Sequence, residues 1–61
     1  MTKPQARQIE LAKRYIALGM IDVAARSVSA CIRCALRQCD IDELMAFAEL
    51  HGLTQNPEFI V

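Results

Sequence analysis

The three cysteines and the single histidine are the residues whose types and spacing could support chemistry. Cys31, Cys34 and Cys39 have the spacing Cys-x2-Cys-x4-Cys, and His51 lies beyond them. Three thiolates and one imidazole would suffice for a tetrahedral zinc ion. However, Cys31 and Cys34 fall inside a continuous helical pattern, where a free cysteine behaves as a small hydrophobic residue. We therefore interpret the cysteines as packing groups, and keep a zinc-stabilised minidomain with these four ligands as an alternative.

No other set of residues in the sequence suggests catalysis. His51 falls at the end of a predicted helix, where an imidazolium favours the negative end of the helix dipole. The sequence has only two glycines and no glycine-rich phosphate loop. A domain this small does not readily form a catalytic cleft, and it has no room for a cofactor fold. We predict a protein that is not an enzyme and that carries no cofactor.

Composition indicates one small globular domain. The 61 residues are 54% hydrophobic and 23% charged, which excludes a disordered polyelectrolyte. A chain of this length buries only about 60% of its unfolded surface, so a partner chain often adds stability. The longest apolar run, residues 15–21, is far shorter than the roughly 20 residues of a membrane span. An odd number of cysteines does not suit a secreted disulfide framework, so we expect a cytoplasmic protein with no membrane segment.

Apolar residues at helical spacing predict three helices and no strand. The first helix covers residues 3–18, with Thr2 as its N-cap, and stops at Gly19. The second covers residues 21–38, and the short connection before it indicates an antiparallel hairpin.

A third helix is predicted over residues 41–51, beginning at a capping box of Asp40 and Glu43 and ending at the C-cap Gly52. An apolar tail, residues 58–61, follows it. The predicted fold is all-α: a single three-helix domain, residues 1–61, with a helical hairpin and a third capping helix.

The hairpin resembles a single, degenerate tetratricopeptide repeat over about half of the chain. Six residues match that pattern: Leu11, Ala12, Tyr15, Gly19, Asp22 and Ala24. Ala12 and Ala24 would place two small residues where the helices cross. Gln8, Val28 and Leu36 depart from the pattern, and Cys31 replaces a small alanine. The resemblance implies a protein-binding scaffold.

Charge is divided unevenly along the chain. Residues 1–39 contain seven basic and two acidic residues, a net charge of +5, whereas residues 40–61 carry a net charge of −5. Such a dipole favours contacts in which the basic hairpin of one copy meets the acidic helix of another, unless the third helix neutralises the hairpin internally. Phosphate would repel the third helix, so it cannot be a recognition helix. A nucleic-acid-associated regulator that uses the basic first helix remains an alternative.

The predicted second helix has more apolar surface than two neighbouring helices would cover. We therefore predict a non-enzymatic protein-interaction module, a homodimer that can also bind or modulate a larger protein. The residues predicted to form the interface are Ala25, Ile32, Leu36, Phe59, Ile60 and Val61. If the chain is monomeric, we expect the tail to fold back over the second helix instead.

Overall fold

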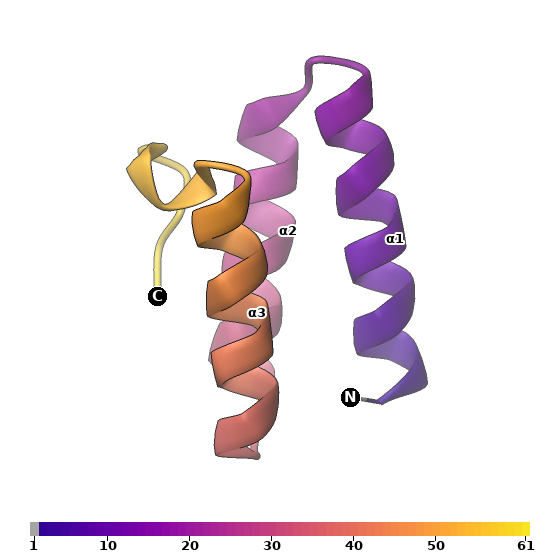
Figure 1. Ribbon diagram of the computed structural model, residues 1–61, viewed down its shortest axis with the longest axis vertical. Coiled ribbons are helices and arrows are strands. Elements are labelled where there is room, and N and C mark those ends of the chain that lie inside the picture. The colour runs from indigo at the N-terminus through magenta and orange to yellow at the C-terminus, as the bar shows by residue number, and fades with distance from the viewer. Residues whose placement is uncertain (1) are drawn as a thin grey trace.

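The computed structural model describes residues 2–61, which form three α-helices and a short 3-10 helix (Figure 1). The helices are α1 (Lys3–Ala17), α2 (Ile21–Cys34) and α3 (Gln38–Leu50), and the 3-10 helix η1 covers Leu53–Gln55. These residues contain no strand, which confirms the predicted all-α fold class.

The start and the end of α1 follow from local hydrogen bonding. The hydroxyl of Thr2 accepts a hydrogen bond from the amide of Gln5 at 3.4 Å, while the Gln5 side chain accepts one from the Thr2 amide at 3.0 Å. This reciprocal capping box satisfies two amides that the first turn leaves without helical partners. After Leu18, Gly19 adopts a φ of +80°, which reverses the chain into α2.

The connection between α2 and α3 differs from the sequence prediction. α2 ends at Cys34 and not at Gln38, and α3 begins at Gln38, three residues earlier than predicted. Ala35 and Arg37 are extended, each with a ψ of 137°, so the chain turns over residues 35–37 and α3 folds back along α2. The helical pattern misled here because Leu36, which continues it, is 97% exposed.

Asp40 is not the N-cap of α3, so the predicted capping box with Glu43 is wrong. Arg37 holds the N-cap position without a side-chain cap bond, and Asp40 and Cys39 lie in the first turn. The Asp40 carboxylate is buried and accepts a hydrogen bond from Nε of Arg37 at 3.2 Å. A carboxylate in the first turn is stabilised by the positive end of the helix dipole.

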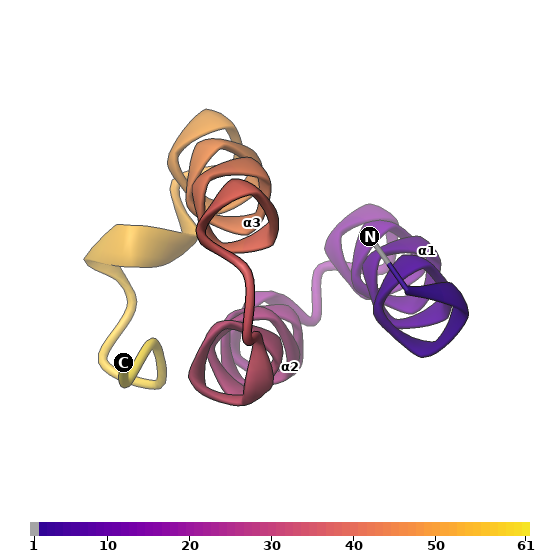
Figure 2. The ribbon, with the colours of Figure 1, turned by 90° about the horizontal axis from the view of Figure 1, so that it is seen from below.

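α2 is the central helix of the domain (Figure 2). α1 and α3 both pack against α2 and run antiparallel to it, and within residues 2–61 they make no backbone contact with each other. The core side chains that they bury are Ala12, Ala24, Ala25, Val28, Ile32, Leu44, Ala48 and Leu53. Ala12 and Ala24 are both fully buried, as expected for small residues at a helix crossing.

The C-terminal tail folds back along α2. Nη1 of Arg33 donates a hydrogen bond to the carbonyl of Ile60 at 2.8 Å, and the side-chain Nδ2 of Asn56 donates one to the Asp22 carboxylate at 2.7 Å. Phe59 packs against the core. The tail therefore covers part of the face of α2 that the sequence assigned to a second copy of the chain.

Candidate functional site

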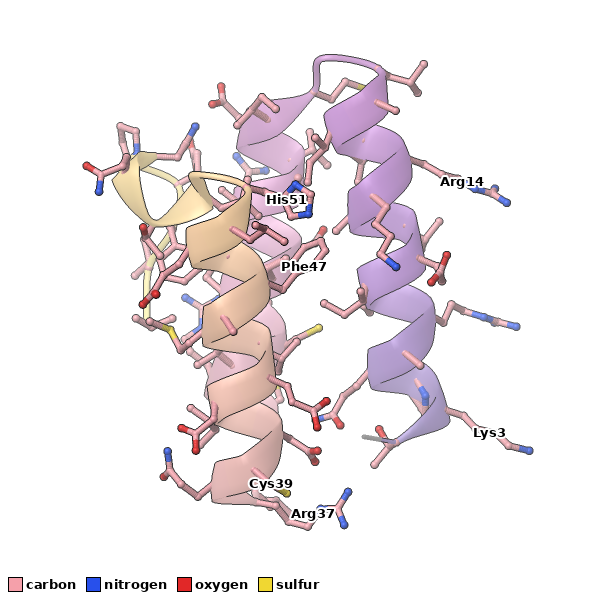
Figure 3. All side chains as sticks on the ribbon, viewed as in Figure 1. Lys3, Arg14, Arg37, Cys39, Phe47 and His51 are labelled. Carbon is pink, nitrogen blue, oxygen red and sulfur yellow. The ribbon has the colours of Figure 1, made fainter. Side chains whose placement is uncertain are left out.

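The four candidate zinc ligands do not come together. Cys39 lies in the first turn of α3 and His51 is the C-cap residue of the same helix, at its opposite end (Figure 3). They lie twelve positions apart along the chain, a distance of about 18 Å at the rise of an α-helix. Among residues 2–61, no three His, Cys, Asp or Glu side chains are grouped so as to hold a metal ion. His51 packs against Phe47, with 4.5 Å between the ring centroids.

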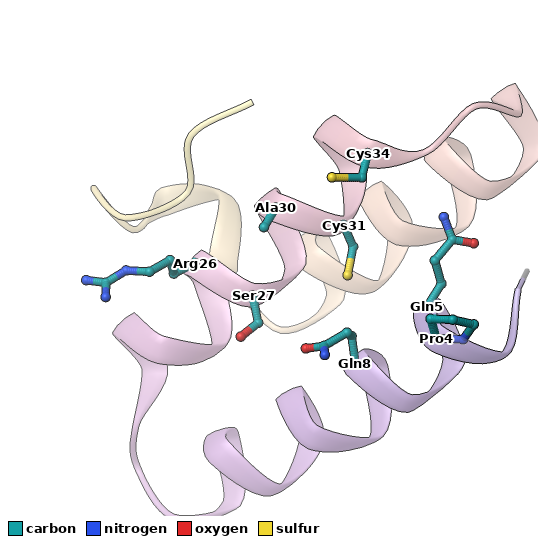
Figure 4. Close-up of a pocket in the computed structure, with 8 residues that line it drawn as sticks. All are labelled: Pro4, Gln5, Gln8, Arg26, Ser27, Ala30, Cys31 and Cys34. Carbon is teal, nitrogen blue, oxygen red and sulfur yellow. The ribbon is translucent and has the colours of Figure 1, made fainter.

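Cys31 and Cys34 line a groove between α1 and α2 (Figure 4). The groove has a volume of about 470 Å³ and a largely apolar surface. We call it the α1–α2 groove; its lining is Pro4, Gln5, Gln8, Arg26, Ser27, Ala30, Cys31 and Cys34. The four small residues of α2 in this set are spaced at three, four and seven positions, so they share one helix face and leave a shallow channel.

The environment of Cys31 does not favour thiolate chemistry. Burial raises the pKa of the Cys31 thiol, and the neighbouring Cys34 raises it further, because a second negative charge nearby is unfavourable. The thiolate is the nucleophilic form of cysteine and the form that binds metals. Cys31 is therefore held as a neutral thiol, which agrees with its interpretation as a packing group. Cys34 and Cys39 are exposed, so the same interpretation is wrong for these two residues.

A second hollow, which we call the lower hollow, continues the groove towards the α2–α3 turn. Pro4, Gln5 and Cys34 line both cavities, and Leu36 extends the apolar surface at the far end. The remaining residues of the lower hollow are Thr2, Arg37 and Asp40. The groove and the lower hollow together form a continuous surface that ends at the most exposed large hydrophobic side chain in the described part of the chain.

Basic residues border the α1–α2 groove on its α1 side. Lys3 and Arg7 form an adjoining hollow with Pro4 and Gln8, which also line the groove. Lys3 and Arg14 project from α1 into solvent (Figure 3). In residues 2–61 neither Lys3, Arg7 nor Arg14 makes an ion pair, whereas Arg26 across the groove pairs with Glu58. Among residues 2–61, Arg26 is the only charged residue that lines the groove, so no carboxylate in this lining competes for an acidic partner.

The predicted interface residues are divided between the core and the surface. Ala25 is fully buried and Ile32 is only 8% exposed, so the expectation that they lie on a free face of α2 is wrong. α3 and the tail cover this side of the helix. Leu36, Ile60 and Val61 are exposed, and Phe59 is half-buried against the core. Only Leu36 adjoins the α1–α2 groove.

The α1–α2 groove was not predicted from the sequence. A signal was present, because the small residues of α2 include Ser27, Ala30 and Cys34, none of which is fully buried. These residues could be recognised as part of a groove only from the packing of α1, which places Pro4 and Gln8 beside them.

Comparisons of this chain with protein-family models, with curated proteins and with solved structures found no match. Between residues 2 and 61, none of the helices has both the length and the apolar character that a membrane span requires.

Proposed function

We propose that this chain is a small, non-enzymatic protein-interaction module that associates with a second copy of itself, with a dimer as the smallest assembly. Leu36 carries this proposal. Its side chain is 97% exposed, and it lies at the end of the apolar surface formed by the α1–α2 groove and the lower hollow. An exposed leucine alone is ordinary, but one continuous with an apolar groove is typical of a surface that binds protein.

The small size of the domain supports the same proposal. In the part of the chain that the structure describes, residues 2–61, eight apolar residues form the buried core, and four of them are alanines. A core of this kind contributes little apolar burial, so association with a second chain would add stability. The resemblance of the α1–α2 hairpin to a tetratricopeptide repeat, a protein-binding scaffold, agrees with this function, and the same surface would serve a larger protein target.

We also propose that the protein is cytoplasmic. Cys31, Cys34 and Cys39 are all free, and two of them are exposed. Exposed thiols persist in a reducing compartment, whereas an oxidising one favours their pairing.

The experiment that tests self-association compares two leucine variants by sedimentation velocity. Leu36→Glu places a charge beside the groove and should shift the protein towards monomer. Leu18→Glu is the matched control, because Leu18 is 74% exposed in the turn at the other end of the hairpin. We expect it to associate as the wild type does. Equal association of the wild type and Leu36→Glu would contradict the proposal.

A nucleic-acid partner is the alternative that the basic residues of α1 suggest. The five acidic residues of 40–61 oppose it, because they would repel phosphate from half of the molecule. We expect no salt-dependent change in fluorescence anisotropy when labelled oligonucleotides are titrated with the protein. Such a change, lost in the Arg7→Glu variant, would favour the alternative.

A further inference from the structure

The solvent-facing side of α3 carries acidic and large aliphatic side chains, which the lining of the α1–α2 groove lacks. Its exposed residues include three carboxylates, a small residue and a large apolar one. We call this surface the α3 outer face: Asp42, Glu43, Ala46, Glu49 and Leu50. These positions recur at helical spacing, so they form one stripe pointing away from the buried Leu44 and Ala48.

An apolar ridge runs along the α3 outer face. Leu50 is 80% exposed and Ala46 lies one turn before it. Acidic residues border this ridge, with Glu43 on one side and Glu49 on the other. In residues 2–61 neither Glu43 nor Glu49 makes an ion pair or a side-chain hydrogen bond, so both are available to a partner.

The α1–α2 groove is the complement of this face in both charge and polarity. Its floor is formed by Ala30, Cys31 and Cys34, and the unpaired cations Lys3 and Arg7 stand beside it. Small floor residues let a second helix approach closely. Oppositely charged groups on the two surfaces would steer the approach and fix its direction.

We propose that the α3 outer face of one copy docks in the α1–α2 groove of another, with Leu50 on the apolar floor and Glu43 and Glu49 near Lys3 and Arg7. This inference rests on the proposed self-association and specifies how the second copy binds. It also gives the division of charge along the sequence, +5 against −5, a role in assembly.

The arrangement is head-to-tail. The groove is lined by α1 and α2 alone, whereas the docking face belongs to α3, so the two surfaces are different. When such a contact does not close into a reciprocal twofold pair, it leaves one groove and one α3 outer face free in every dimer. These free surfaces can add a third copy, so wild-type assemblies grow beyond the dimer as concentration rises.

Two charge-reversal variants test this arrangement. The groove variant is Lys3→Glu/Arg7→Glu, and the face variant is Glu43→Lys/Glu49→Lys. The reversals at Lys3 and Glu49 place each charge at the helix end that favours it, so helical folding is retained, which circular dichroism checks. Each variant alone should associate at least about tenfold more weakly than the wild type, because its groove and its α3 outer face now carry the same charge and repel each other.

Mixing the two variants gives the decisive result. The intact groove of the face variant can accept the intact α3 outer face of the groove variant. Sedimentation of an equimolar mixture should therefore show association restored towards that of the wild type. The reversed groove and the reversed α3 outer face are also opposite in charge to each other, so the mixture can again grow beyond the dimer. Arg14→Glu is the control, since Arg14 is an unpaired cation on the same helix but does not line the groove. It should associate as the wild type does.

The outcomes separate this inference from the proposed function. If the wild type associates and either double variant associates equally well, the head-to-tail contact is wrong while self-association stands. If both variants are monomeric and their mixture stays monomeric, the pairing of these two surfaces is also wrong. A wild type that remains monomeric overturns both the inference and the proposed function.

Discussion

The guanidinium of Arg26 lies 3.2 Å from the carboxylate of Glu58 and joins the middle of α2 to the C-terminal tail. Arg26 also lines the α1–α2 groove, so one side chain borders both the tail and the proposed docking surface. Both side chains are well exposed, and such an ion pair contributes little stability by itself. The packing of Phe59 and the hydrogen bond from Arg33 to Ile60 also hold the tail.

Phe59 should contribute more to folding than the apolar residues that follow it. We expect Phe59→Ala to lower the free energy of unfolding by about 1 to 3 kcal/mol, less than the loss for a fully buried phenylalanine. Ile60→Ala is the control, because Ile60 is 59% exposed and its loss should change stability by about 0.5 kcal/mol or less. Urea denaturation measures both values. Equal effects of the two substitutions would mean that the tail does not pack through Phe59.

Gly52 should resist substitution because of its backbone conformation. Its φ is +70°, and a Cβ added there would meet no atom within 4 Å, so the penalty comes from conformation and not from crowding. We expect Gly52→Ala to lower stability by about 1 kcal/mol. Gly52→Asn should lose less, since asparagine tolerates this region better. An alanine variant that melts at the wild-type temperature would show that the C-cap conformation is not required.

Asp40 should make stability depend on pH. Burial acts to raise its pKa, but charge-assisted hydrogen bonds, that of Arg37 among them, outweigh burial and lower the pKa. An acid whose pKa is lower in the folded state stabilises the fold above its unfolded pKa of about 3.9, and this contribution is lost as the pH falls through the folded value.

We therefore expect the melting temperature of the wild type to fall more steeply below about pH 4 than that of Asp40→Asn. Arg37→Gln should flatten the profile in the same direction, because it removes a partner of the carboxylate. Thermal melts followed by circular dichroism across this range measure the slopes. Parallel profiles for all three proteins would refute the role of Asp40.

The three cysteines should react with alkylating reagents at different rates. Cys31 is half-buried with a raised pKa, whereas Cys34 and Cys39 are exposed. Because the thiolate reacts, we expect Cys31 to be modified last by iodoacetamide at mildly alkaline pH. Peptide mass spectrometry at successive times gives the order. Modification of Cys31 before the other two would mean that the groove activates this thiol.

Local signals in the sequence predicted the elements whose ends are set locally. The Thr2–Gln5 capping box, the turn at Gly19 and the positive φ of Gly52 each depend on a few adjacent residues. The burial of Ala12 and Ala24 followed from their spacing on two antiparallel helices.

Features that depend on tertiary packing could not be predicted in this way. Nothing local stops α2 at Cys34, because Ala35 and Leu36 continue its apolar pattern and the turn lacks glycine and proline. The burial of Ala25 and Ile32 depends on where α3 and the tail pack, and the α1–α2 groove depends on how α1 crosses α2. The uneven distribution of charge was visible in the sequence. The position of basic residues beside the groove and of acidic residues on α3 could be known only from the fold.

Self-association is the central claim, and sedimentation equilibrium of the wild-type protein over a series of concentrations tests it most directly. We predict that the average mass rises above the 6.8 kDa of the monomer as concentration increases, and that added salt reverses the rise because it screens the charges between copies. A single 6.8 kDa species at every concentration and salt condition would contradict the account.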